Sequence, residues 1–439
     1  MSRQWRGSQG GALGSLPLPS EDQYLYCIRC GQCLSVCPIY RETLRETDGP
    51  RARVALARKV AEGELALSPR LVDNMYECLA CGACNAACPV GIKPADLALA
   101  MRYVIHEALP QPWCKRPIFH GLFPHPGAMD LALWPLRLYQ RLGVQALARR
   151  TGILKALPAQ LQDMEAMLPP LPLRPLRATL PEVTLAIGPA RRRVAFFLGC
   201  FQNLLFAQAS AATIRVLARN GCEVVTPKGT RCCGMPALGY GERDLARDLA
   251  RHNIDIFTAL QSDVIVTDCA TCGSTLKEYG ALLADDPAYA DKARAFSARV
   301  RDISEYLASI NILPPRGEIA ARVTYHDPCH LVREQKVRAQ PRMLLSMIPG
   351  LEYVEMSEAD GCCGSAGTQL ITHYHNSLGV NLRKMENVRA TGADLVATGC
   401  PGCRMQLAMG ARHFGVQVRV LHPVQLLDEA YQAEGAKHT

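Results

Sequence analysis

Cysteine has the most evident chemistry in this sequence, because two runs of four cysteines with identical spacing lie in its first hundred residues. Both runs have the spacing C-x2-C-x2-C-x3-C-P. This is a 4Fe–4S motif in which three cysteines hold one cluster and the fourth ligates the cluster of the other run. It predicts two clusters, the first on Cys27, Cys30, Cys33 and Cys88, and the second on Cys78, Cys81, Cys84 and Cys37.

The surroundings of the two runs favour iron–sulfur clusters over zinc. Structural zinc sites use C-x2-C pairs and not two complete runs of this kind. Gly31 and Gly82 lack a Cβ and would allow the backbone to approach the sulfides closely. Forty residues lie between Cys37 and Cys78, which is more than a minimal ferredoxin needs. We therefore expect a mostly helical dicluster 4Fe–4S ferredoxin domain over residues 21–109, with one helix from about Pro50 to Gly63.

Ten further cysteines form an internal repeat in residues 194–439. Each copy has one cysteine, then an adjacent pair followed by glycine (CCG), and then a C-x2-C pair. In the first copy 31 residues separate the single cysteine from CCG and 35 separate the CCG pair from C-x2-C. In the second copy these separations are 32 and 36 residues. The ten are Cys200, Cys232, Cys233, Cys269, Cys272, Cys329, Cys362, Cys363, Cys400 and Cys403. Such agreement indicates a duplication. Adjacent cysteines can serve two irons of an opened cluster, so all ten are candidate metal ligands.

Each copy is predicted to be an α/β module. The short apolar runs VAFFL, VIVT, VTYH and LVAT are typical of buried parallel strands, and residues 211–220 and 242–260 are expected to be helical. Each strand ends at or just before a cysteine, and open α/β sheets place their sites at the carboxyl ends of strands. We expect CCG module 1 over residues 191–315 and CCG module 2 over 316–439.

Composition limits where this protein works. The chain has 439 residues, 20 of them cysteine, and its first 20 residues lack an apolar signal-peptide core, so we expect a disordered tail there and reduced thiols in the cytoplasm. No run reaches the ~18 apolar residues of a membrane span. The net charge of +9 suits an anionic membrane surface or an acidic partner. No nucleic-acid-binding motif is present, so nucleic acid is not an expected partner.

Residues 110–190 are rich in proline and arginine and are predicted to connect the two halves. The stretch from Trp113 to about Leu176 is both apolar and basic. Such a stretch can lie at a membrane interface or line a quinone pocket, although most pack as connectors across two domains. The expected location is therefore cytoplasmic, with peripheral contact at the inner face of the cell membrane as the open alternative.

Several single residues have weaker signals. Cys114 and Cys222 lie outside every motif and are expected to be small buried apolar residues. His326 and His330 flank Cys329 and could donate to cluster sulfurs, move protons or contact a quinone, although hydrogen-bonded structural histidines are the commoner case. No nucleotide or flavin motif is found, so no catalytic residue and no cofactor beyond the clusters is assigned to this chain.

The arrangement of these motifs resembles known families. The CCG repeat resembles the twin cysteine-rich modules of the heterodisulfide reductase catalytic subunit, in which each set of five cysteines holds a non-cubane 4Fe–4S centre. The fusion of a dicluster domain to two such modules resembles the iron–sulfur subunits of glycolate oxidase and of D-lactate dehydrogenase. The stretches DGPRARVALARKVAEG, HNID, KEYG, AYADKAR and CCGSAGT resemble the glycolate oxidase subunit in particular.

The resemblance implies an electron-transfer subunit of a flavin-dependent 2-hydroxy-acid dehydrogenase. Electrons would come from an FAD-containing dehydrogenase subunit and pass toward quinone, and the substrate would be oxidised on that other chain. Some members of this branch lack cysteines in their CCG modules, whereas this chain has all ten, which keeps a heterodisulfide-reductase-like catalytic role open. A third hypothesis is that the chain is an assembly protein whose clusters only stabilise a docking surface. The CCG modules are candidate sites for one or two further 4Fe–4S clusters.

Overall fold

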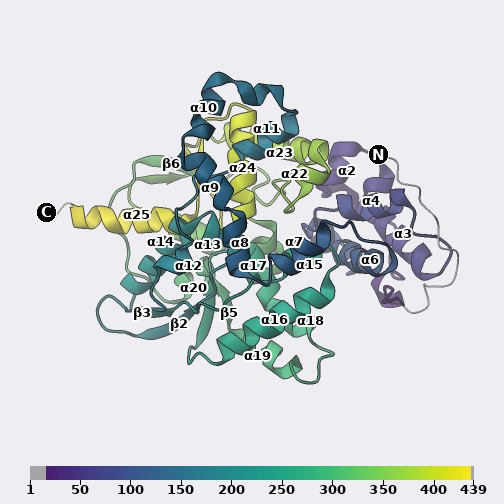
Figure 1. The fold of residues 1–439 in the computed structure, drawn as a ribbon, viewed down its shortest axis with the longest axis horizontal. Coiled ribbons are helices and arrows are strands. Elements are labelled where there is room, and N and C mark those ends of the chain that lie inside the picture. Colours follow the sequence, from purple (N-terminus) through teal and green to yellow (C-terminus); the bar gives the residue numbers. More distant parts are fainter. Residues whose placement is uncertain (1–15, 437–439) are drawn as a thin grey trace. The chain divides into compact units, whose positions relative to one another are not determined.

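The computed structural model of this chain describes residues 16–436. Its Cα positions form two compact units. The first is Met1–Arg116 with Pro236–Arg243, and the second is Pro117–Met235 with Asp244–Thr439 (Figure 1). The first unit therefore includes a short segment from the middle of the sequence, which no sequence pattern indicated. The predicted tail at residues 1–20 falls largely on residues 1–15, which lie outside the described residues.

All regular elements of the first unit within residues 16–114 are helices. They are η2 (Glu21–Gln23), α1 (Gln32–Ser35), α2 (Pro38–Thr43), η3 (Glu46–Asp48), α3 (Pro50–Ala61), α4 (Pro69–Glu77), α5 (Ala83–Ala87) and α6 (Pro94–Ala108). Proline is the first residue of four of them, because its fixed φ and missing N–H suit the first helical turn. Helix α3 begins at Pro50 as predicted from its sequence.

Helices α3, α4 and α6 build the core of the first unit. Val54, Met75 and Met101 are fully or almost fully buried at the centre of this core. Leu16 and Leu18 also pack against it, so the chain is held at the start of the described residues. The long helices support the cysteine loops, which lie between the short helices α1, α2 and α5.

Short helices also make up most of the connector. They are α7 (Lys115–Gly121), α8 (Pro126–Ala132), α9 (Trp134–Arg141), α10 (Val144–Thr151), η4 (Ile153–Ala156), α11 (Ala159–Ala166) and α12 (Leu176–Thr179). Among the described residues, we find no helix with the length and apolar character that crossing a bilayer requires.

The first CCG module contains a five-stranded sheet in the order β1-β3-β2-β4-β5. Its strands are β1 (Val183–Thr184), β2 (Arg192–Phe196), β3 (Cys222–Val225), β4 (Val264–Thr267) and β5 (Val300–Asp302). Only β1 is antiparallel to its neighbour. The helices are α13 (Cys200–Leu204), α14 (Ala207–Arg219), α16 (Arg243–Thr258), α17 (Ala270–Lys277), α18 (Tyr279–Leu282), α19 (Ala290–Arg299) and α20 (Ile303–Ser309), while α15 (Met235–Gly239) falls almost wholly within the segment that belongs to the first unit.

The second module repeats this topology with a parallel sheet in the order β7-β6-β8-β9. Its strands are β6 (Ala321–Tyr325), β7 (Leu351–Tyr353), β8 (Leu395–Ala397) and β9 (Arg419–Leu421). Its helices are η5 (His330–Glu334), α21 (Ala339–Ser346), α22 (Gln369–Thr372), α23 (Tyr374–Ala390), α24 (Pro401–His413) and α25 (Pro423–Ala436). The order β7-β6-β8-β9 corresponds to β3-β2-β4-β5 of the first module, as a duplication requires.

The two modules share one hydrophobic core. Phe196 and Val266 from the first sheet belong to the same buried cluster as Tyr325 and Leu395 from the second. Helices α14 and α20 contribute to it from one module, and α21 and α25 from the other. A bidentate ion pair between Arg215 and Asp428 joins α14 to α25 at the edge of this core. The modules therefore form one body and hold their cysteine loops in a fixed relation.

Candidate metal centres

In the first unit the structure brings Cys37 to the other cysteine run. Cys37, Cys78, Cys81 and Cys84 line a single cavity, together with Arg53. Burial raises the pKa of the Cys37 thiol to about 11, and the positive charge of Arg53 opposes that rise. Four thiols around one cavity are a suitable ligand set for a cubane cluster, because the metal replaces their protons on binding.

The remaining four cysteines of the two runs gather at a second place. Burial, followed by the charges of Cys27, Cys30 and Cys88, raises the pKa of the Cys33 thiol to about 11. Cys30 is exposed and the other three are half-buried, whereas the set around Cys37 is buried. The first set therefore lies nearer to solvent than the second.

The two cysteine loops share an unusual backbone conformation. Gly31 and Gly82 have φ of 84° and 69°, which is the left-handed region that glycine adopts without strain. Arg29 and Ala80, two residues earlier in each run, also have positive φ, at 56° and 48°. The two loops thus curl in the same way, so the repeat in sequence is also a repeat in local structure.

Two buried arginines lie behind the second run. Arg53 Nε donates to the carbonyl of Asn74 at 3.0 Å, and Arg102 Nε donates to the carbonyl of Met75 at 3.0 Å. Arg102 also donates to the carbonyl of Cys78. A buried positive charge is costly unless a negative charge balances it. A thiolate-bound cluster is anionic, so these arginines fit such a group.

In CCG module 1 the five cysteines come from three loops and meet. Cys200 begins α13, Cys232 and Cys233 follow β3, and Cys269 and Cys272 lie at the start of α17. Hydrogen bonds with Cys200 and Cys233 raise the pKa of the Cys232 thiol well above its usual value. Cys233 interacts in turn with Cys272, and Cys272 with Cys269, whose sulfur accepts the backbone N–H of Cys272 at 3.4 Å.

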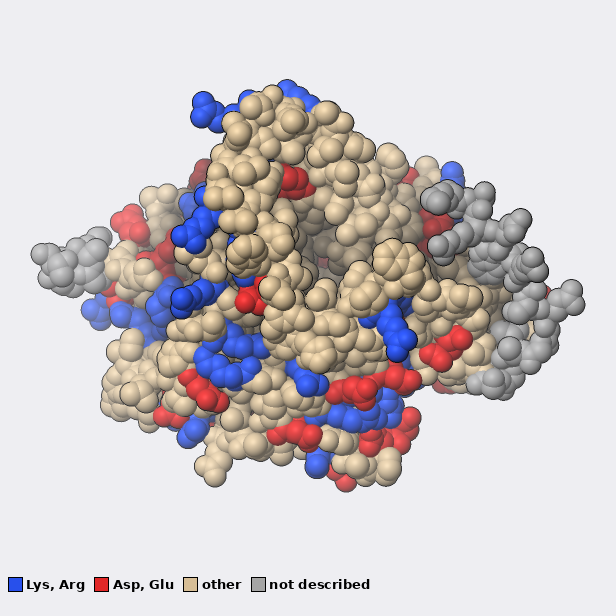
Figure 2. All heavy atoms as spheres, viewed as in Figure 1, with Lys and Arg blue, Asp and Glu red and all other residues tan. Residues whose placement is uncertain are grey.

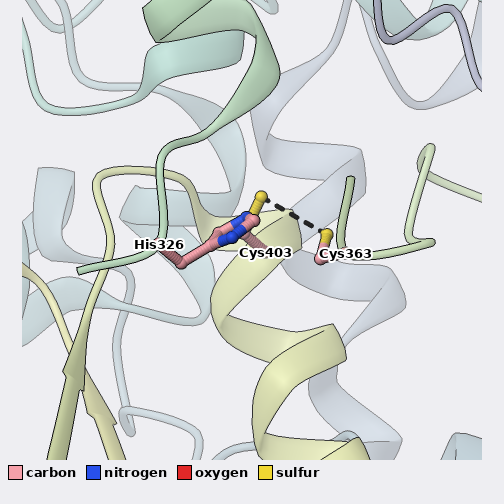
Figure 3. Close-up of side chains that lie close together, drawn as sticks. All are labelled: His326, Cys363 and Cys403. Carbon is pink, nitrogen blue, oxygen red and sulfur yellow. Dashed lines mark hydrogen bonds between the residues drawn. The ribbon is translucent and has the colours of Figure 1, made fainter. Parts of the chain in front are cut away.

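CCG module 2 repeats this arrangement with one addition. The sulfurs of Cys363 and Cys403 lie 3.5 Å apart, and hydrogen bonds with Cys362 and Cys403 lower the pKa of the Cys363 thiol well below its usual value. A ring nitrogen of the buried His326 and the sulfurs of Cys363 and Cys403 all lie within 4.8 Å of one another, and Figure 3 shows the three side chains converging. Cys329 lies 3.6 Å from His330 Nδ1, at the start of the π-helical turn η5.

The two sets of five meet at Cys269 and Cys400. These thiols interact directly, and Thr271 Oγ1 lies 3.3 Å from Cys400 Sγ. Hydrogen bonds with Cys269 and Cys403 lower the pKa of the Cys400 thiol well below its usual value. Thiol interactions therefore run without a break from one module into the other, through Cys200, Cys232, Cys233, Cys272, Cys269, Cys400, Cys403, Cys363 and Cys362.

Hydrogen bonds to main-chain carbonyls stabilise the contact between the loops of Cys269 and Cys400. Ala270 N–H donates to the carbonyl of Gly399 at 2.9 Å, and Gln335 donates to the carbonyl of Ala270 at 2.8 Å. His422 Nδ1 accepts from Val424 N–H, so its Nε2–H donates to the carbonyl of Asp268 at 3.1 Å. Burial lowers the pKa of His422 to about 3, so it is neutral in this role.

The surroundings of both CCG sets fit a cluster bound by thiolates. A Cβ at Gly199 would lie 3.1 Å from Cys272 Sγ, and a Cβ at Gly364 would lie 2.6 Å from the carbonyl of Ser377. Larger residues there would push a loop away from its sulfurs. The buried Lys384 lies near Cys363 and Cys362, and the half-buried Arg177 lies near Cys200. Each set thus has a cation able to balance anionic ligands.

Several supporting residues were not found from the sequence. Asn253 donates to the carbonyl of Cys232 at 3.1 Å, and Asn381 donates to that of Cys363 at 3.0 Å. Tyr279 donates to the carbonyl of Cys233 at 2.9 Å. The two asparagines occupy the first long helix after each CCG, so an alignment of the two copies against each other could have identified them. Thr271 had no such signal.

Two sequence expectations need correction. Cys222 is fully buried in β3 as expected, but the Cys114 side chain is exposed, because the turn before α7 leaves it outside the core. His326 was expected to be a hydrogen-bonded structural residue. Its buried ring makes no hydrogen bond to a nitrogen or oxygen atom of the described residues, and it instead interacts with the Cys363 thiol, whose pKa it lowers. This contact makes His326 a candidate donor to a metal-bound sulfur.

Comparison with known proteins agrees with this geometry. The sequence matches the profile of a 4Fe-4S dicluster domain over residues 23–92 and of the cysteine-rich domain over 194–277 and 323–408. Residues 110–168 match the linker region of the glycolate oxidase iron-sulfur subunit. A crystal structure of a hypothetical protein from Helicobacter pylori has the same fold, with a TM-score of 0.56 and 9% identity over 92% of this chain and 73% of that chain. Together these features define an iron–sulfur protein with a dicluster domain and two cysteine-rich modules.

Two relatives show the family. The probable glycolate oxidase iron-sulfur subunit of Bacillus subtilis (strain 168) is 38% identical over 419 residues, which cover 93% of this chain and 94% of the relative. The glycolate oxidase iron-sulfur subunit of Escherichia coli (strain K12) is 30% identical over 421 residues, with 93% and 94% covered. The chain belongs to the family of glycolate oxidase iron–sulfur subunits.

Proposed function

We propose that this chain conducts electrons from an FAD-containing subunit that oxidises a 2-hydroxy acid, glycolate or D-lactate, toward quinone. The observation that carries the proposal is the meeting of the two sets of five CCG cysteines at Cys269 and Cys400, where Thr271 Oγ1 lies 3.3 Å from Cys400 Sγ and Ala270 N–H donates to the carbonyl of Gly399. Bound 4Fe–4S clusters supply single-electron transfer there. The protein itself holds the ligands at fixed spacing. The shared core and the hydrogen bond from Ala270 N–H to the carbonyl of Gly399 provide this rigidity.

The ligand sets follow from the groups of thiols. We assign one cluster of a helical dicluster ferredoxin domain to Cys27, Cys30, Cys33 and Cys88, and the other to Cys37, Cys78, Cys81 and Cys84. One further cluster in each CCG module would use all five cysteines of its set. The domain boundaries that we propose are 21–109, 110–190, 191–315 and 316–439.

The solvent exposure of the two ferredoxin sets favours a direction of electron flow. Cys30 is exposed and its three companions are half-buried, so electrons from a docked flavoprotein can reach this set over a short distance. The buried set around Cys37 would then receive them within the same unit. Electrons would leave through the CCG modules, and quinone as acceptor implies peripheral contact with the cell membrane.

A catalytic role for the CCG modules is the second candidate. The presence of all ten cysteines favours it, as does the position of His326 beside Cys363 and Cys403, where an imidazole could exchange a proton with a bound disulfide or quinone. In that case the isolated chain would reduce a disulfide or quinone with an artificial electron donor. The electron-transfer role requires no such activity.

The test is reduction of the purified chain by substrate. With its flavoprotein subunit present, adding glycolate or D-lactate under anaerobic conditions should bleach the iron–sulfur absorbance. Without that subunit neither acid should cause bleaching, while dithionite still should. Bleaching of the isolated chain by the acid would contradict the proposal, and so would a complex in which the flavin is reduced but the clusters stay oxidised.

A further inference from the structure

The connector presents a large apolar face to solvent. Leu131, Leu142, Leu147 and Ile153 are 72%, 67%, 62% and 66% exposed, and Trp134 is 58% exposed. They lie on or beside α8, α9, α10 and η4. Single exposed leucines are ordinary, but several of them with a tryptophan, on helices that contact one another, mark a surface that contacts another apolar phase.

Several polar side chains of these helices form hydrogen bonds toward the protein, whereas apolar side chains of the same helices face solvent, which is the reverse of a normal surface helix. Gln140 donates to the carbonyl of Pro169 at 3.0 Å and accepts the N–H of Leu171 at 2.8 Å. The buried Arg137 donates to the carbonyl of Pro172 at 3.0 Å. Arg137 and Gln140 of α9 thus point toward the protein, whereas Trp134 and Leu138 of the same helix are exposed.

Helix α10 is held in the same way. Gln145 donates to Glu165 on α11 at 2.7 Å, and Arg149 pairs with the same carboxylate at 3.0 Å. Helix α11 is itself fixed to CCG module 2, because Asp163 accepts from Tyr374 at 2.8 Å and contacts His413 at 3.1 Å. Turning the apolar face inward would break these bonds, so the exposure of Leu142 and Leu147 is built into the packing.

Charge indicates what this face meets. Residues 131–162 contain no aspartate or glutamate. Arg141, Arg150 and Lys155 are exposed among the apolar residues, and none forms an ion pair with any residue that the structure describes. Figure 2 shows the region of α10, at the top of the view, in the blue of Lys and Arg and the tan of uncharged residues. An acid-free, basic and apolar surface complements an anionic lipid headgroup layer over acyl chains.

We propose that this face, formed by Leu131, Trp134, Leu142, Leu147, Ile153, Arg141, Arg150 and Lys155, binds the surface of an anionic lipid bilayer. The apolar side chains enter the boundary between headgroups and acyl chains, and the basic side chains stay among the phosphates. The inference rests on the proposed function in one respect, since it places the chain where a membrane quinone can be reached. It deepens that function by naming the surface that makes the contact.

The experiment is flotation of the anaerobically purified full chain with lipid vesicles. The chain should float with vesicles that contain phosphatidylglycerol and should stay behind with pure phosphatidylcholine. Leu142→Glu with Leu147→Glu should weaken vesicle binding at least tenfold. Arg141→Gln, Arg150→Gln and Lys155→Gln together should weaken it about a hundredfold. Leu313→Glu is the matched control, because Leu313 is 56% exposed outside this face, and it should float like the wild type.

Two readouts separate this surface from the proposed function. Trp134 fluorescence should shift to the blue on phosphatidylglycerol vesicles, and the Leu142→Glu, Leu147→Glu variant should lose that shift while keeping its visible iron–sulfur absorbance. Equal flotation of the wild type and the variant would overturn the proposal. It would also be overturned if the wild type did not float and the variant lost its flavoprotein subunit, because the face would then bind that subunit. Reduction by 2-hydroxy acid in vesicle-free solution should be unchanged, so failure there in the wild type would contradict the electron-transfer role instead.

Discussion

Thr271 of one cysteine-rich module lies with its hydroxyl oxygen 3.3 Å from the sulfur of Cys400 in the other module. Once Cys400 binds metal as a thiolate it can only accept, so the threonine must then donate. This contact and the neighbouring interaction of Cys269 with Cys400 join the two sets of five cysteines. The two cysteine sets therefore adjoin each other at this point and are not two separate sites.

Thr271→Val should lower the midpoint potential of the centre in module 2. The substitution removes a hydrogen bond worth ~0.5–1.5 kcal/mol, which corresponds to about 20–60 mV for a one-electron couple. The direction is downward because donors to sulfur stabilise the more negative, reduced state. Potentiometric EPR measures the shift, and Thr271→Ser should restore the wild-type value. A Thr271→Val potential equal to that of the wild type would show that the hydroxyl does not act on the centre.

His326→Phe should alter module 2 and leave module 1 unchanged. Phe197 occupies the corresponding place in module 1, in VAFFLGC against VTYHDPC, so the substitution makes the two sites alike. Loss of an imidazole donor beside Cys363 and Cys403 should lower the potential by roughly 65–130 mV, taking a charge-assisted hydrogen bond as ~1.5–3 kcal/mol for a one-electron couple. The signals of module 1 provide the internal control in EPR titrations. Movement of both sets of signals together would contradict a local role.

The crossed assignment of the fourth cysteines has its own test. Cys37→Ser should broaden or abolish the EPR signal that Cys81→Ser also affects, because Cys37 and Cys81 line the same cavity. Cys88→Ser should instead match Cys30→Ser. Each variant should lose at most one cluster, or about four irons, from the purified chain. Pairing of Cys37→Ser with Cys30→Ser would refute the assignment.

Asp302 should make stability depend on pH. It caps α20, its Oδ1 accepts from Ser304 N–H at 2.8 Å, and burial raises its pKa from 3.8 to about 7. Between about pH 4 and pH 7 the folded chain keeps a proton that the unfolded chain releases, so the free energy of unfolding falls as pH rises through this window. The total is at most about 4 kcal/mol, at ~1.4 kcal/mol per pKa unit.

Asp302→Asn keeps the helix cap but cannot ionise. Its apparent Tm should therefore exceed that of the wild type at pH 8, and the difference should shrink as pH falls toward 5.5. Differential scanning calorimetry at a fixed scan rate is the measurement. A difference in Tm that does not change with pH would show that Asp302 does not titrate in this range.

A large part of the candidate sites could be predicted from the sequence, because the cysteine spacings and short apolar runs that indicate them are local features. The spacing C-x2-C-x2-C-x3-C-P indicated that Cys37 would join the other run, and the structure places Cys37 with Cys78 around one cavity. The apolar runs before Cys200, Cys269 and Cys400 indicated parallel strands, and β2, β4 and β8 occupy those positions. Short apolar runs with fixed cysteine spacing are signals that a single sequence contains.

The remaining features depend on contacts between distant residues. Nothing near Thr271 indicates that it meets Cys400, since 128 residues lie between them. The outward-facing leucines of α9 and α10 have the spacing of ordinary amphipathic helices, and only the inward bonds of Gln140 and Gln145 show which face is exposed. Cys114 could not be distinguished from Cys222 by sequence, because exposure depends on the packing of the whole unit.

Iron and sulfide quantitation with EPR on the anaerobically purified chain tests the central claim most directly. If all eighteen motif cysteines bind four 4Fe–4S clusters, the chain should contain about sixteen irons and as many sulfides, with the signals assigned to the CCG modules lost in Cys233→Ser and Cys363→Ser. A content of about eight irons, with only cubane signals that both variants retain, would contradict it. The series of thiols across the two modules would then be a structural feature and not an electron path.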